Sequence, residues 1–456
     1  MASKPMFRKL KMLWGLARPQ WERLLRLKGE ILWVVVGQIG NFIAGFLVVK
    51  CLSNLLTVEG FGRYALGMTF VGFLHMFFYN PINAVLFRFF PIHRKRETLG
   101  GLLRIMQKWH IRAGSWFLLG AFLSAGVLGW LTDAGWGLLV LVGTVYGIIS
   151  GTQLSFISTG QSLRKRKAIG IFQCLDALFR PAMAVAFILL IRNSAIAVFF
   201  GFAIITALLT HYLSHQLRQV PDVEKAWRQL GPVRGEDEAI GAECWGYFRT
   251  FLIWSVLGIL STYSDRWIVQ GLLGSRDLGL YAAVQQIAAA VIVNSGSTLS
   301  QVVIPIIWER AGTLTTKIEY DRSMGLLRKS LGVAILMHGS MVAVCWFWAP
   351  RIVRLLTAEA FVEKADLLWI IALANMILFI GGFLQTQGMT LNRPEIYYWP
   401  KIHQTVGFVL IAVPLTLRHG VVGLAWAGCL ASVIFTLSTM WMNRRLPTFR
   451  TDPKPA

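Results

Sequence analysis

The chain has 456 residues, of which 55% are hydrophobic and 15% charged, with a mean hydropathy of +0.57 and a formal net charge of +23. Soluble domains contain about 25% charged residues, so this composition excludes an ordinary water-soluble protein. The cations concentrate in short loops between apolar segments, which is not the pattern of a basic nucleic-acid-binding domain, and we expect no nucleic-acid partner.

Residues 1–29 form a basic segment that also carries apolar side chains, among them Trp14 and Trp21. This mixture is typical of an amphipathic helix lying on an anionic membrane surface, so we expect membrane lipids of the anionic inner leaflet as partners. The segment lacks a compact apolar region followed by small residues, and no cleavable signal peptide is expected.

Apolar stretches of about 20 residues, the length that crosses a hydrocarbon core, recur through the rest of the chain. Backbone groups in lipid must be hydrogen-bonded within each such segment, which predicts helices. We therefore predict an all-α, polytopic membrane protein with about twelve transmembrane helices. The predicted helices are 30–54, 62–90, 111–131, 135–159, 169–191, 194–213, 246–272, 279–306, 330–349, 365–389, 397–416 and 420–442.

These helices divide into two lobes of six. The expected domains are the N-terminal segment 1–29, an N-lobe 30–213, a cytoplasmic linker 214–244, a C-lobe 245–443 and a cytoplasmic tail 444–456. The linker holds an acidic patch, Glu236-Asp237-Glu238, which we interpret as a solvated charge run. Residues 351–361 predict a short amphipathic helix at the outer interface.

The loops alternate between rich and poor in Lys and Arg. The rich set includes residues 94–96, 164–167 and the linker, whereas residues 132–134 contain no cation. Because cationic loops stay on the cytoplasmic side, both termini are expected there. We expect a multi-pass membrane protein.

A short motif occurs once in each lobe. Residues Asn54–Ala65 read NLLTVEGFGRYA, and Gly271–Ala282 read GLLGSRDLGLYA. Each copy follows one apolar segment and begins another. The copies occupy matching positions in the two lobes, which favours a duplication over the alternative that this sequence merely suits a tight turn. Duplicated membrane bundles are typical of transporters, with the substrate site between the halves.

Charged side chains within the bilayer mark functional sites, because an unpaired charge is costly there. The candidate substrate-binding cations are Arg88, Arg180, Arg266 and Lys401, and the candidate coupling acids are Asp176 and Asp265. The surplus of cations predicts a cavity that attracts an anion. An internal i,i+4 salt bridge is the alternative for Asp176 and Arg180, and anchoring near the membrane surface is the alternative for Arg88 and Lys401.

Polar side chains gather on predicted helices 1, 2, 7 and 8, which flank the two motif copies. They are Gln38, Asn41, Asn80, Asn83, Thr262, Asp265, Gln286, Asn294, Ser297 and Gln301. We expect them to line the cavity, and interhelical hydrogen bonding that only holds the bundle together is the alternative. The five cysteines show no metal-type spacing, and we expect no metal, no cofactor and no catalytic residue.

Three features resemble one known family: Leu-Leu-x5-Gly-x-Tyr-Ala after the first and seventh helices, Asp265-Arg266 within the seventh, and Arg88 at the end of the second. They are similar to the polysaccharide-transport branch of the oligosaccharide flippase superfamily, which includes O-antigen flippases. Lipid II flippases and multidrug and toxic-compound extrusion transporters are relatives. The resemblance implies two six-helix lobes around a V-shaped central cavity, with the cavity-cation role falling on Arg88 and Arg266. Unlike the drug-extrusion relatives, this chain has no carboxylate in the first helix beyond Glu30 at its entrance.

The expected function is to flip a polyprenyl-pyrophosphate-linked oligosaccharide from the inner to the outer leaflet by alternating access, for cell-surface polysaccharide assembly. The lipid-linked glycan is the expected substrate, and polysaccharide assembly proteins are further candidate partners. One alternative is a cation-coupled multidrug antiporter using Asp265 or Asp176. A second, of another class, is a membrane glycan polymerase or ligase, which needs acid and base groups that the short outer loops do not offer, and we expect no enzyme. A lipid scramblase-like or structural membrane protein is the third.

Overall fold

The computed structural model describes residues 33, 36–40, 42–131, 134–163, 165–191, 194–228, 236–311, 316–391 and 393–446. Every regular element in these ranges is a helix, and ten of the helices are long and apolar enough to cross a membrane. The expectations for segment 1–29 and for Asn41 lie outside the described residues.

The N-terminal half begins with a helix at Val36–Leu55, which packs against α6 where Gly40 approaches Cys174. The helices that follow are α2 (Val58–Leu74), η1 (His75–Tyr79), α3 (Asn80–Lys95), α4 (Leu99–Leu131), α5 (Ala134–Ser162), α6 (Arg166–Leu190) and α7 (Ala195–Arg218). The π-helical turn η1 lies directly before Pro81. Because Pro81 has no N–H to donate one turn back, the wider turn there accommodates the missing bond.

The C-terminal half follows a short helix, α8 (Pro221–Arg228). Its elements are α9 (Glu236–Leu272), α10 (Ser275–Ala311), α11 (Lys317–Leu356), η2 (Glu359–Lys364), α12 (Leu367–Leu384), α13 (Thr386–Thr390), η3 (Pro394–Tyr397) and α14 (Tyr398–Arg444). Within α14 the backbone of Gly420 has φ 59°, a left-handed conformation that favours glycine. His403, before this glycine, hydrogen-bonds Ser438, after it, at 2.9 Å, so the chain runs back along itself. The element α14 therefore consists of two antiparallel helices. Counted in this way, the described part contains the twelve predicted long helices.

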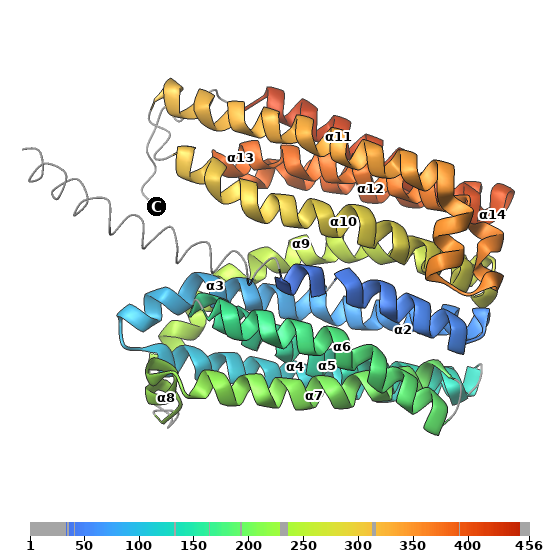
Figure 1. Ribbon diagram of the computed structural model, residues 1–456. Coiled ribbons are helices and arrows are strands. Elements are labelled where there is room, and N and C mark those ends of the chain that lie inside the picture. Colours follow the sequence, from blue (N-terminus) through green and yellow to red (C-terminus); the bar gives the residue numbers. More distant parts are fainter. Residues whose placement is uncertain are drawn as a thin grey trace, which may run out of the picture.

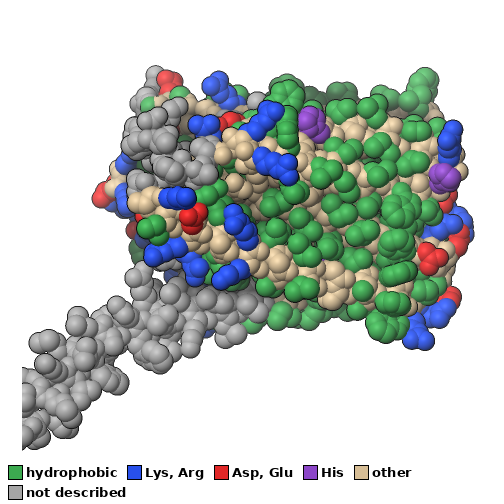
Figure 2. All heavy atoms as spheres, turned by 90° about the horizontal axis from the view of Figure 1, so that it is seen from above, with side chains coloured by type: hydrophobic (Ala, Val, Ile, Leu, Met, Phe, Trp, Pro, Cys, Tyr) green, Lys and Arg blue, Asp and Glu red, His purple; other side chains and the backbone are tan. Residues whose placement is uncertain are grey.

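The two halves lie side by side, with α9 running between them (Figure 1). We call the end of the bundle at α8 and the start of α9 the linker end, and the end where α2 and α10 begin the far end. Figure 2 shows apolar side chains covering the broad middle of one face, with Lys and Arg side chains toward its two ends. The helix α11 exposes the large apolar side chains Leu336, Trp346 and Phe347. An apolar band between charged ends is the surface expected of a membrane-spanning bundle.

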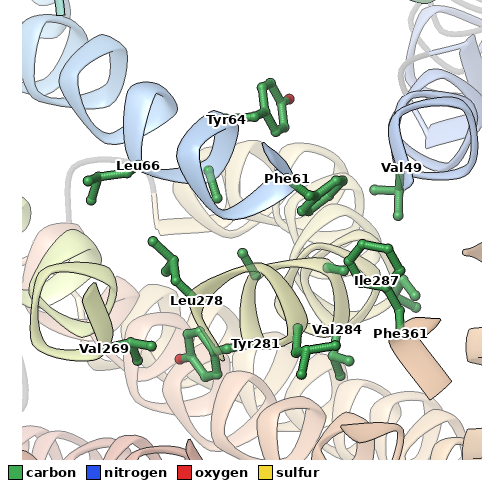
Figure 3. Close-up of a cluster of buried hydrophobic side chains, with 14 of the residues drawn as sticks. Val49, Phe61, Tyr64, Leu66, Val269, Leu278, Tyr281, Val284, Ile287 and Phe361 are labelled. Carbon is green, nitrogen blue, oxygen red and sulfur yellow. The ribbon is translucent and has the colours of Figure 1, made fainter. Parts of the chain in front are cut away.

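The two copies of the repeated motif meet at the far end. A Cβ placed on Gly62 would lie 2.0 Å from the carbonyl oxygen of Ser275, and one on Gly279 would lie 2.0 Å from that of Val58. The glycines therefore allow the first turns of α2 and α10 to touch backbone to backbone. The motif tyrosines Tyr64 and Tyr281 point in opposite directions, each into its own half (Figure 3).

Further contacts join the halves at the far end. The Lys50 ammonium donates to the carbonyl oxygen of Thr357 at 2.9 Å, where α11 has just ended. The rings of Phe61 and Phe361 meet edge to face with centroids 5.4 Å apart. A cation at a helix C-terminus is favourable because it faces the negative end of the helix dipole. The halves are thus closely packed at this end.

At the linker end, α9 is fastened to the N-terminal half. Asp237 accepts from Arg104 at 2.9 and 3.0 Å and from Lys108 at 2.9 Å, and the Arg104 side chain is only 6% exposed. The interpretation of the acidic patch as a solvated charge run is therefore wrong for Asp237. Sequence alone does not show that α4 passes beside this patch.

Other boundaries also differ from the predicted ones. Most of the described part of linker 214–244 is helical, because α7 continues to Arg218 and α9 already begins at Glu236. Residues 351–356, predicted as part of a separate amphipathic helix, are the last turns of α11 beyond a kink at Trp348. Pro350 causes this kind of kink because its ring clashes with the preceding turn.

Candidate functional site

Asp265 and Arg266 of α9 form one hydrogen-bonded network with α10. Asp265 Oδ2 accepts from the Tyr281 hydroxyl at 2.9 Å and from the Gln285 amide at 2.5 Å. The oxygen of the same Gln285 amide accepts from Arg266 Nε and Nη2 at 3.3 and 3.2 Å. As the spacing of neighbouring residues predicts, the two charges do not meet directly through their side chains. Gln285 joins them instead.

The network also reaches the N-terminal half. Arg266 Nη1 donates to the backbone oxygen of Ala65 in α2 at 3.0 Å. Ala65 and Tyr281 both belong to the repeated motif, so the two motif copies hold this network from opposite sides. Arg266 thus links the C-terminal half to α2 of the N-terminal half.

The network forms one wall of a cavity of about 480 Å³ within the C-terminal half. Its walls come from α9, α10, α12 and both parts of α14. The predicted site residues Thr262, Asp265, Arg266, Gln286 and Lys401 all line it. The polar or aromatic lining residues that sequence reasoning missed are Ser261, Tyr263, Tyr281, Gln285, Asn375, Gln404, Phe408 and Ser432.

Lys401 lies at the base of α14 and faces this cavity. Its ammonium donates to Gln404 Oε1 at 3.0 Å and lies 5.8 Å from the centre of the Phe435 ring. Across the cavity, the buried Asn375 amide nitrogen has no hydrogen-bond partner among the described residues. An ammonium has three N–H donors, so Lys401 and Asn375 leave donors available to an anionic or hydroxyl-bearing ligand.

A second cavity, of about 460 Å³, lies between the halves toward the linker end. Gln38 of the first helix and Gln301 of α10 line it, as predicted. Five further polar or aromatic lining residues were missed, namely Trp33, Phe87, Gln161, Arg166 and Gln173. Amides and an aromatic ring are side chains that suit sugars, because they offer hydrogen bonds and an apolar stacking face.

The remaining predicted residues lie elsewhere. Arg180 bonds Asp176 one turn away on α6, which is the salt bridge offered as the alternative. Asn83 accepts from Ser155, which also bonds His110, so Asn83 belongs to a network inside the N-terminal half. Arg88, Asn80, Asn294 and Ser297 are exposed, and Ser297 accepts from Gln301 at 3.1 Å. The structure therefore distributes the predicted residues over two cavities, the bundle interior and exposed positions rather than around a single site.

No metal-binding geometry accompanies either cavity. Within the described ranges, no group of three or more His, Cys, Asp or Glu side chains is arranged to hold a metal ion. The carboxylate of Asp265 is already occupied by protein donors.

Comparison with known proteins fits this architecture. Residues 27–230 match the family described as "Polysaccharide biosynthesis protein". The fold is similar to the lipid II flippase MurJ in an inward closed conformation, with a TM-score of 0.67 and 12% identity over 90% of this chain and 87% of that one. No curated protein sequence matches the chain.

Drug-extrusion transporters share the same fold. An inward-facing multidrug resistance MATE transporter of the MOP superfamily aligns with a TM-score of 0.58 and 12% identity, over 91% of this chain and 98% of that one. A MATE transporter of Vibrio cholerae gives 0.59 and 13%, over 92% and 95%. The chain is an all-α membrane protein whose fold is similar to that of MurJ and of these MATE transporters. Over residues 27–230, the family match agrees with the resemblance to a polysaccharide-transport family.

Proposed function

We propose that this protein flips a polyprenyl-pyrophosphate-linked oligosaccharide across a bacterial inner membrane. The observation that carries the proposal is the charge of the C-terminal cavity. Its lining contains two cations, Arg266 and Lys401, against one carboxylate, Asp265. Asp265 already accepts hydrogen bonds from Tyr281 and Gln285. A cavity with excess positive charge favours a pyrophosphate over a cationic drug.

The two cavities are suited to bind different parts of the substrate. The glutamine-rich cavity between the halves offers amides and Trp33 to the sugars, while the C-terminal cavity offers cations to the pyrophosphate. The lipid chain stays in the bilayer, because its transfer to water would be costly. Separation of the motif copies would then open the space between the halves at the far end. Opening of this second end is the step that alternating access requires.

The test is ligand binding by the purified full-length protein. We expect a polyprenyl pyrophosphate to bind more tightly than tetraphenylphosphonium, a lipophilic cation. Lys401→Gln should weaken pyrophosphate binding by about tenfold or more, because a charge-assisted hydrogen bond is lost. Lys329→Gln is the matched control, since Lys329 is exposed on α11 and lines neither cavity.

Transport provides the second measurement. In vesicles, Arg266→Ala should abolish flipping of a lipid-linked oligosaccharide, and Arg266→Lys should restore part of it, because lysine keeps the charge but loses the forked geometry. Size-exclusion profiles separate this effect from loss of folded protein. Tighter binding of the cation, with Asp265→Asn abolishing it, would instead support the multidrug antiporter.

A further inference from the structure

A third cavity lies on the outer face of α6 and α7 at the linker end, and Arg166 lines both this cavity and the one between the halves. It has a volume of about 410 Å³. Three consecutive cations line it, Lys165, Arg166 and Lys167, together with Tyr212 and Gln216 of α7. All five side chains are exposed. No acidic residue is among its lining residues, so the hollow carries a concentrated positive charge at the level where a spanning bundle meets lipid headgroups.

An apolar track leads away from this basic hollow along α7. Tyr212, Leu208, Ile204 and Phe200 recur every fourth residue and are 46%, 61%, 39% and 40% exposed. Residues at this spacing lie on one face of a helix. The track therefore starts at the cations and continues toward the middle of the bundle.

The neighbouring helix α6 supplies a second apolar edge. Ile171 lines the hollow itself, and Leu178 and Phe179 follow two turns later, 61% and 48% exposed. Below the hollow, Leu213 of α7 and Phe172 of α6 are fully buried in a common apolar cluster, which holds the two helices together. The surface thus combines a cluster of three exposed cations with exposed apolar side chains on two neighbouring helices.

We propose that this surface is a binding site for an anionic diacyl phospholipid. The phosphate lies among Lys165, Arg166 and Lys167, and the acyl chains follow the exposed faces of α6 and α7. A zwitterionic lipid lacks the net charge that three cations select. A free phosphate lacks the chains that the apolar edges would cover. The site shares Arg166 with the cavity proposed for the sugars but uses neither Arg266 nor Lys401, so its test varies only Lys165 and Lys167.

The experiment counts lipids retained by the intact full-length protein in native mass spectrometry. The probes are dioleoyl phosphatidylglycerol, dioleoyl phosphatidylcholine, glycerol phosphate and a polyprenyl pyrophosphate. We expect saturable binding of phosphatidylglycerol, and little of phosphatidylcholine or glycerol phosphate. The double variant Lys165→Gln/Lys167→Gln should bind phosphatidylglycerol roughly 30-fold more weakly, since each cation near a membrane surface strengthens binding about fivefold.

The matched control is Lys317→Gln/Lys329→Gln, which removes the same charge from exposed positions of α11 outside the hollow. It should bind phosphatidylglycerol as the unchanged protein does. A second variant, Leu208→Gln, tests the acyl track and should weaken lipid binding without any change in charge. Equal losses in the test and control variants, equal retention of phosphatidylcholine, or binding confined to the polyprenyl pyrophosphate would each overturn the proposal.

Discussion

Gln285 connects the acid and the cation of the C-terminal cavity, because one end of its amide bonds Asp265 and the other bonds Arg266. Replacing it with leucine leaves both charged groups short of a partner. We expect Gln285→Leu to destabilise the protein by about 1.5–3 kcal/mol, the typical contribution of a hydrogen bond to a charged group. Thermal unfolding in detergent measures the change.

Gln286→Leu is the control for this prediction. Gln286 lines the same cavity, yet its side chain makes no hydrogen bond within the described part of the chain. It should therefore change the unfolding temperature less than Gln285→Leu does. Equal effects of the two variants would show that Gln285 acts only by filling space.

Asp237 gives a pH-dependent prediction outside the membrane-spanning segments. Burial acts to raise the pKa of Asp237, but hydrogen bonds from Arg104 and Lys108 and their charges outweigh it, and the pKa falls below its usual value near 3.8. A carboxyl whose pKa is lowered by folding stabilises the folded state above its unfolded pKa and loses this contribution as the pH falls through the folded pKa. Asp237→Asn should therefore lower stability at pH 7 and at pH 5 alike.

The difference between Asp237→Asn and the unchanged protein should shrink only below about pH 4. Thermal unfolding followed from pH 7 to pH 3 measures it. Glu238→Gln is the neighbouring control, because Glu238 is exposed and should show little effect at any pH. A loss of the Asp237 effect already at pH 6 would contradict the assigned ion pair.

At the scale of elements, the contact between α2 and α10 depends on two glycines. A methyl group on Gly62 has no space beside the Ser275 carbonyl, since the neighbouring atom is backbone and cannot rotate away. We expect Gly62→Ala and Gly279→Ala each to separate the first turns of the two helices and to cost about 1–3 kcal/mol. Thiol labelling of the native Cys51, on the first helix near this end, should become faster.

Gly271→Ala tests whether the effect is specific. Gly271 lies in the last turn of α9, and a Cβ there meets nothing within 4 Å. Alanine is the better helix former, so this variant should be neutral or slightly stabilising. If all three variants behaved alike, close packing of the motif copies would not be the reason for glycine at positions 62 and 279.

For the whole molecule, the charge of the loops predicts orientation. We expect both termini and linker 214–244 on the cytoplasmic side. In a cysteine-free background, single cysteines at 132–134 and 417–419 should react with a membrane-impermeant thiol reagent added outside intact cells. Cysteines at 160–168 should react only after the membrane is permeabilised. External labelling at 160–168 would reverse the assignment.

Much of the fold follows from local sequence properties. Long apolar segments predict helices because lipid leaves the backbone no other partner, and the repeated motif predicts two related halves. Element boundaries were less predictable. The helices extend beyond the apolar segments, as α4 does through Arg104 and Lys108, because charged side chains continue a helix once its ends leave the lipid.

The candidate site was predictable only in part. Asp265, Arg266 and Lys401 were found because charge is rare in apolar helices, and they do share a cavity. Gln285, Asn375 and Gln404 were missed, because an uncharged amide in a helix is as often a packing contact as a site residue. Asn83 and Arg180, selected by the same reasoning as the true cavity residues, bond within their own half.

The sequence by itself determined that this protein lies in a membrane, that it is helical and which charges its membrane segments carry, because these depend on properties of single segments. The tertiary structure alone decided that Gly62 meets Gly279, that Gln285 bridges Asp265 and Arg266, and that the predicted residues divide between two cavities. These contacts join residues distant in the chain, and the rotation and depth of each helix set them. Packing against neighbouring helices fixes both quantities, and no single segment encodes them.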